Sequence, residues 1–161
     1  MKTLTINLDE LSFVLHRGRG LYMHCFLDLE NGKILNIPTN RDVVRQVLGI
    51  TGNNFSSNAL SLQLTENKKD RLLEIPDRFD LIIYDLMTEF TRSIEKENLI
   101  LADQLWKIIH RGEGYHTFHA VLTEHPGMLR KFVNLKDAVF EKDTIDWLEQ
   151  NNIRWQSLQK D

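Results

Sequence analysis

The sequence predicts an α+β fold: a small antiparallel sheet of two hairpins packed with a mainly helical C-terminal half. Short segments between residues 20 and 75 alternate apolar and polar side chains, as strands do. From residue 76 onward the apolar side chains recur with the helical period of 3.6. We expect a single domain over residues 1–161, with an α/β part over 1–75, a helical part over 76–153 and a tail over 154–161.

The chain opens with a predicted helix. Asn7 and Glu10 have the spacing of a capping box, and the apolar stripe that follows ends before Gly18. A second short helix is predicted over residues 39–49, where Thr39 stands at the start.

Two hairpins are predicted between these helices and residue 75. Residues 22–30 and 33–37 flank an Asn-Gly pair at 31–32, which is typical of a two-residue type I′ turn and would pair Glu30 with Lys33. This places two sets of apolar side chains on opposite faces: Cys25, Leu27, Leu29 and Ile34 on one, Phe26, Leu35 and Ile37 on the other. A second hairpin over residues 60–65 and 73–75, with a charged turn at 66–70, would extend the sheet to four strands.

Four helices are predicted after residue 75. The first begins near Pro76, which suits a first helical turn, and its stripe runs to about residue 94. The others cover about 98–110, 115–124 and 128–151. We expect the chain beyond Trp155 to fray.

The composition favours some classes of protein over others. Cys25 is the one cysteine, so no internal disulfide can form and a cytoplasmic location is expected. No apolar run is long enough for a membrane span. Residues 1–75 carry nine basic and eight acidic side chains, and residues 76–161 carry eleven and fifteen, so a nucleic-acid partner is disfavoured.

Residues 111–119 are the strongest candidate for a site. The segment combines a glycine-rich helix break with aromatic and ionisable side chains, so we predict ligand-binding residues there: Arg111, Glu113, Tyr115, His116 and His119. On a helix His116 and His119 share one face, which is the spacing of paired metal ligands. A metal site could be completed by Glu113, Glu124, His110 or His125. Because no zincin motif or paired cysteines accompany them, histidines that face solvent or pack at a helix edge are the competing interpretation.

Other motifs give weaker support for chemistry. Cys25 lies in a predicted strand among apolar neighbours, which is typical of an inert packed thiol. The glycine pairs at 18–20 and 112–114 do not continue into a phosphate-binding fingerprint. The sequence therefore predicts no cofactor and holds no complete catalytic motif.

Scattered positions over residues 22–153 resemble a bacterial group, uncharacterised protein family 0158. They are residues 28–33, Ile75-Pro76, Met87-x-x-Phe90, the glycine-rich break followed by aromatic-x-x-aromatic, and Trp147-Leu148 before Asn152-Ile153. The family's break typically reads Gly-basic-Gly-Ala-Phe-Arg-Arg-Phe-Lys. Here Tyr115 and Phe118 match the aromatics, while His116, Thr117 and His119 stand where basic residues would be. The resemblance implies a fold and a cytoplasmic location but no activity.

Three functional hypotheses remain open. The first is a small non-catalytic module that binds a protein or a small molecule, with no membrane contact. The second is a metal-assisted hydrolase or metal-binding protein that uses the histidine cluster. The third is a nucleic-acid-associated protein that uses Arg17, Arg19, Arg111 and the 115–119 helix.

Overall fold

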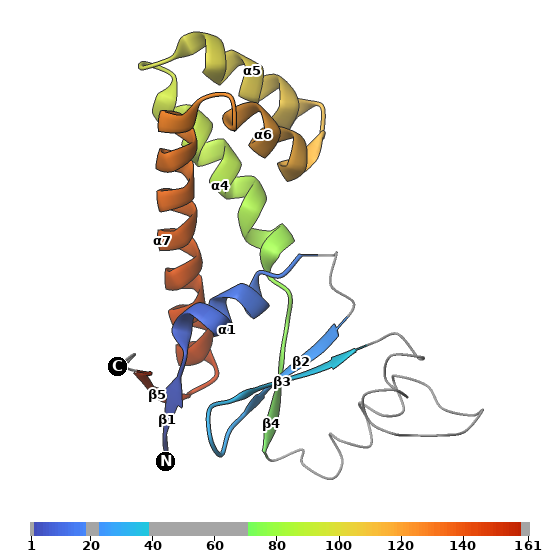
Figure 1. Cartoon of the computed structure of the whole chain (residues 1–161), viewed down its shortest axis with the longest axis vertical. Helices are drawn as coiled ribbons and strands as arrows, with labels where there is room; N and C mark the ends of the chain where they lie inside the picture. Colours follow the sequence, from blue (N-terminus) through green and yellow to red (C-terminus); the bar gives the residue numbers. More distant parts are fainter. Residues whose placement is uncertain (1, 19–22, 39–70, 159–161) are drawn as a thin grey trace, which may run out of the picture. The chain divides into compact units, whose positions relative to one another are not determined.

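A computed structural model of the chain describes residues 2–18, 23–38 and 71–158 (Figure 1). The chain divides into two compact units, one formed by residues up to 77 together with those from 144, the other by residues 78–143. Strands lie in the first unit and most helices in the second, so the α+β class is confirmed. The helix predicted over 39–49 and the strand and turn predicted over 60–70 lie outside the described residues. The expectation of a single domain stays a prediction.

Two strands from opposite ends of the chain pair in the first unit. Strand β1 (Thr3–Ile6) runs parallel to β5 (Arg154–Ser157), with Leu4 beside Trp155. The amide of Leu158 extends the pairing by donating to the carbonyl of Ile6 at 2.9 Å. The prediction of a frayed tail after Trp155 is therefore wrong for residues 156–158, because Gln156 and Ser157 pair with β1 and Leu158 bonds to its end. The last three residues of the predicted tail lie outside the described residues.

Helix α1 (Leu8–Leu15) follows β1 directly. The side chain of Asn7 accepts a hydrogen bond from the amide of Glu10 at 3.1 Å, which confirms the predicted cap. The apolar stripe of α1 faces the core and consists of Leu11, Val14 and Leu15.

The second sheet of this unit has the strand order β3-β2-β4 in the described part of the chain. It comprises β2 (Met23–Asp28), β3 (Ile34–Pro38) and β4 (Leu72–Ile75), and both pairings are antiparallel. The predicted hairpin therefore exists. Residues 73–75, predicted as part of a second hairpin, belong to β4 and pair directly with β2.

The turn of this hairpin differs from the prediction. The amide of Asp28 donates to the carbonyl of Lys33, so the loop holds four residues, 29–32. Of these Gly32 alone has a positive φ, at 76°, whereas a type I′ turn needs two such residues. The observed pairs, such as Leu27 with Ile34, are shifted by two residues from the predicted register. A shift of two preserves the face of every side chain, so the predicted faces are retained.

Arg71 joins the hairpin loop to the start of β4. Its guanidinium makes paired contacts with Asp28, the shortest from Nη2 to Oδ2 at 2.8 Å, and its Nη1 lies 2.9 Å from Glu30 Oε2. Glu30 thus pairs with Arg71 and not with Lys33, because the longer loop turns it toward β4. Arg71 lowers the pKa of the Asp28 carboxyl below its usual value by donating hydrogen bonds to it.

The core of this unit combines both sheets, α1 and the last residues of α7 (Pro126–Gln150). Its buried members are Leu4, Ile6, Leu11, Val14, Leu15, Cys25, Leu27, Ile75, Trp147 and Leu148. After α7 the amide of Ile153 donates to the carbonyl of Leu148, and the amide of Asn152 to that of Glu149. This is a Schellman motif, and Asn152 occupies its left-handed position with φ 57°.

The second unit is helical. It holds α4 (Phe79–Ile94), α5 (Leu99–His110), α6 (Gly114–Leu122) and residues 126–143 of α7 (Figure 1). These bounds confirm the four predicted helices to within about three residues; α4 starts after Pro76, whereas α7 includes Pro126 in its first turn. Among the described residues, no helix has the length and apolar content of a membrane span.

Three phenylalanines lie at the centre of this helical core. Phe90, Phe118 and Phe132 come from α4, α6 and α7, and their ring centroids lie 5.2–6.3 Å apart. The carboxylate of Asp143 on α7 accepts two hydrogen bonds, of 2.9 and 3.0 Å, from the guanidinium of Arg78 before α4. Two contacts therefore connect α4 to α7: the packing of the phenylalanines in the core and the ion pair between Arg78 and Asp143.

We predict that Asn152→Val destabilises the protein by about 1–2 kcal/mol, because a β-branched residue strains the left-handed position of the Schellman motif. Asn152→Gly keeps that conformation without strain and should leave stability within about 0.5 kcal/mol of wild type. Urea unfolding followed by circular dichroism measures both. Equal losses for the two substitutions would contradict the role assigned to Asn152.

We also predict that the stabilisation by Asp28 depends on pH. Because its folded pKa lies below the ordinary value, the contribution is complete above pH about 4 and is lost as the pH falls through the folded pKa. Asp28→Asn should therefore lower stability at neutral pH and match wild type in strong acid. Unfolding curves of both proteins across the acid range test this, and a difference independent of pH would refute it.

Candidate functional site

The glycine-rich break at residues 111–114 ends one helix and starts the next. The amide of Glu113 donates to the carbonyl of Ile108 at 3.1 Å, and that of Gly112 to Ile109 at 3.2 Å, so α5 also ends in a Schellman motif. Gly112 and Gly114 both have positive φ, at 64° and 85°. The break is therefore built by two residues that adopt the left-handed conformation without strain.

The structure distributes the predicted site residues over different environments. Arg111, Glu113 and His116 are exposed, whereas Tyr115 and His119 are half-buried. The Tyr115 ring packs edge-on against Phe79 at 5.4 Å and lies 5.7 Å from the ring of His119. Tyr115 and the fully buried Phe118 thus attach α6 to the core of the helical unit.

The histidines do not gather into a metal-binding group with other ligands. Across residues 2–18, 23–38 and 71–158, no three His, Cys, Asp or Glu side chains are placed to hold a metal ion. The ring of His110 stacks on Trp106 at 5.7 Å, which gives it a packing role. A metal bound by His116 and His119 stays a prediction.

A hollow of about 300 Å³ lies beside the break in the helical unit. Its lining joins α4, the end of α5 and the start of α6: Phe79, Asp80, Ile83, Tyr84, Met87, Ile109, Gly112, Gly114 and Tyr115. Ile83, Met87 and Ile109 are buried, while Tyr84 is 55% exposed. Of the predicted site residues Tyr115 alone lines this hollow, which has an apolar floor and an accessible aromatic edge.

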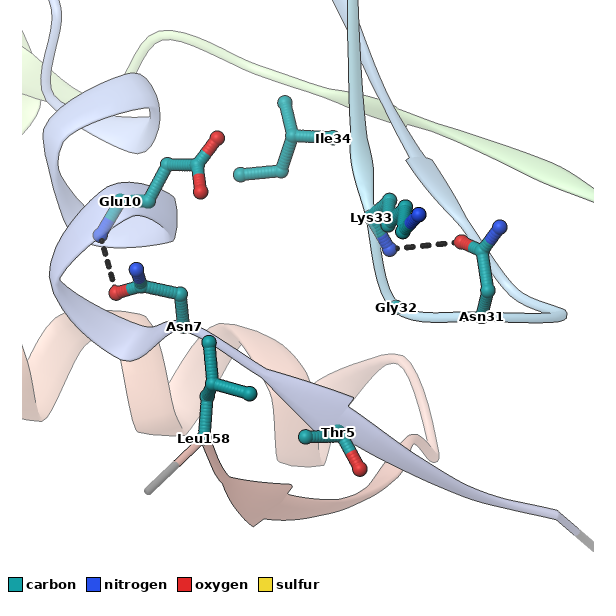
Figure 2. A pocket seen from close by; sticks show the side chains of 8 residues that line it. All are labelled: Thr5, Asn7, Glu10, Asn31, Gly32, Lys33, Ile34 and Leu158. Atoms are coloured by element: carbon teal, nitrogen blue, oxygen red, sulfur yellow. Dashed lines mark hydrogen bonds between the residues drawn. The ribbon is translucent and has the colours of Figure 1, made fainter. Parts of the chain in front are cut away.

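A second, more polar cleft of about 410 Å³ lies in the first unit. Figure 2 shows Asn7 and Glu10 on one wall, residues 31–33 of the hairpin loop opposite them, and Ile34, Thr5 and Leu158 between. The loop reaches this position because Gly32 has no side chain: a Cβ there would lie 2.3 Å from the carbonyl oxygen of Thr5.

Each asparagine of this cleft has its amide oxygen fixed by a backbone hydrogen bond. The oxygen of Asn7 accepts from the amide of Glu10 at 3.1 Å, and that of Asn31 from the amide of Lys33 at 2.9 Å (Figure 2). These bonds fix the orientation of each side-chain amide, and its nitrogen can donate.

Two further candidates have structural roles. Arg17, predicted as a nucleic-acid contact, donates through Nη1 to the carbonyls of Val14, Ile75 and Pro76 at 2.8–3.2 Å. Cys25 is buried, and burial raises the pKa of its thiol; nearby Arg17 opposes this rise and Asp77 adds to it. A thiol with a raised pKa is a poor nucleophile at neutral pH.

Sequence reasoning missed most residues of both hollows. Tyr84 carried a usable signal, because an aromatic side chain beside Asp85 lies off the buried stripe of α4. The polar cleft had none, since its lining comes from segments as distant as Thr5, the hairpin loop and Leu158.

The family model of the Uncharacterised protein family (UPF0158) matches residues 1–160. The match covers nearly the whole chain, so the chain belongs to this family and the resemblance drawn from its motifs is confirmed. A search of curated proteins found no match, and neither did a search of solved structures.

Proposed function

We propose that this member of the Uncharacterised protein family (UPF0158) is a non-catalytic binding module whose helical unit takes an apolar side chain of a partner protein. The observation that carries the proposal is an accessible Tyr84 at the edge of a hollow with a buried apolar floor. Accessible aromatic residues beside such floors are typical anchors of protein interfaces.

The hollow has the shape that an anchor side chain needs. Ile83 and Met87 lie about one turn apart on α4, and Ile109 of α5 lines the same hollow. The floor is therefore built by two helices of a packed core. Gly112 and Gly114 form part of the rim, and a Cβ at either position would meet no atom within 4 Å. The rim therefore leaves open space for an approaching chain.

The charged residues of the break are sequence neighbours of residues that line this hollow. Arg111 and Glu113 are exposed and flank Gly112, and His116 follows Tyr115 by one residue. An apolar centre with a polar, solvent-accessible rim is the usual composition of a protein interface. Arg111, Glu113 and His116, which were predicted as ligand-binding residues, would thus form part of the polar rim of the interface with the partner.

The composition of the lining favours binding over chemistry. Asp80 is the one ionisable carboxylate among the lining residues, which include no histidine, cysteine, serine or lysine. The other ionisable groups of the lining are the phenols of Tyr84 and Tyr115, so the hollow lacks the histidine or the pair of carboxylates that acid–base catalysis most often uses.

We also propose that the protein works in the bacterial cytoplasm. The single Cys25 supports this location, because it is buried and cannot form an internal disulfide, as suits a reducing compartment.

The test is a selection of peptides from a random display library on the full chain. We expect selected peptides that carry an apolar or aromatic anchor, and Tyr84→Asp should weaken their binding about tenfold or more. Fluorescence anisotropy with labelled peptides measures the affinities.

Ile100→Asp is the matched control, because Ile100 is another apolar residue of the same unit, is 85% exposed and lies outside the hollow. It should leave the affinity within about twofold. Selection of no peptide, or peptides that bind Tyr84→Asp as tightly as wild type, would refute the proposal.

A further inference from the structure

We propose that the polar cleft between the hairpin loop and the start of α1 binds a free α-amino acid in its zwitterionic form. The cleft lies in the first unit, so this proposal is independent of the hollow in the helical unit. Its volume of about 410 Å³ falls in the range of small-molecule sites.

The cleft is lined by one acidic and one basic side chain that do not form an ion pair with each other. Glu10 contributes a carboxylate and Lys33 an ammonium, and the two come from different walls (Figure 2). Within the described residues, neither side chain forms an ion pair with the other or with a third group. A cleft with an available anion and an available cation suits a ligand that carries both charges.

Besides the ammonium of Lys33, the cleft contains the side-chain amides of two asparagines. Because backbone amides hold the oxygens of Asn7 and Asn31, the orientation of each side-chain amide is fixed and its nitrogen can donate to a ligand. A ligand carboxylate would accept from Lys33, and a ligand ammonium would donate to Glu10.

Two of the remaining lining residues are apolar. Ile34 is half-buried and Leu158 is half-exposed, and both border the cleft (Figure 2). They would contact the side chain of the amino acid, so we expect a preference for aliphatic side chains such as that of leucine.

Isothermal titration calorimetry of the full chain with a panel of standard L-amino acids tests the proposal. We expect L-leucine to bind, and we expect Glu10→Gln and Lys33→Met each to weaken its binding about tenfold. N-acetyl-L-leucine lacks the ammonium, so Glu10→Gln should not weaken its binding further. L-leucinamide lacks the carboxylate, so Lys33→Met should not weaken its binding further.

Glu141→Gln and Lys142→Met are the control variants, because both residues are exposed on α7 and lie outside the cleft. They should bind L-leucine like wild type, and Tyr84→Asp should do so too. The proposal is overturned if no amino acid of the panel binds. It is equally overturned if Glu10→Gln and Lys33→Met, checked for folding by circular dichroism, bind as wild type does.

Discussion

The close approach of Gly32 to the backbone of β1 is the constraint on which the first unit depends. The glycine is buried in the hairpin loop with φ 76°, and a Cβ there would overlap the carbonyl oxygen of Thr5. Both the conformation and the space therefore require glycine. With the loop seated on β1, Leu27 and Ile34 of the hairpin join Ile6 of β1 in one core.

The same contact shapes the polar cleft. Asn31 and Lys33, on either side of Gly32, form the wall opposite Asn7 and Glu10 (Figure 2). A hairpin held away from β1 would separate the two charges that we propose to bind a zwitterion. Stability and the proposed site thus depend on one backbone approach.

Local periodicity predicted the helices well, because each stripe is a feature of consecutive residues. Phe90 and Phe118 are buried on helices that the helical period predicted. Asn7 and Asn98 cap helices by accepting hydrogen bonds from the amides of Glu10 and Leu101. The hairpin was predicted with the right faces and the wrong turn, since an Asn-Gly pair also fits the end of a four-residue loop.

The pairing of strands that are far apart in the sequence could not be predicted from local patterns. Strands β1 and β5 have four residues each and come from opposite ends of the chain, so neither carries a strong local signal. The candidate sites differ for the same reason. Tyr115 was identified because it adjoins a visible helix break, whereas the cleft draws Thr5, Asn31 and Leu158 together only in the fold.

The most direct test is the free energy of unfolding of Gly32→Ala, measured by urea denaturation beside Gly127→Ala. Gly127 is helical and a Cβ there would meet no atom within 4 Å, so its substitution should leave the protein as stable or up to about 1 kcal/mol more stable. Gly32→Ala should cost at least about 2 kcal/mol, because the loop must leave β1. A Gly32→Ala protein as stable as wild type would contradict the account.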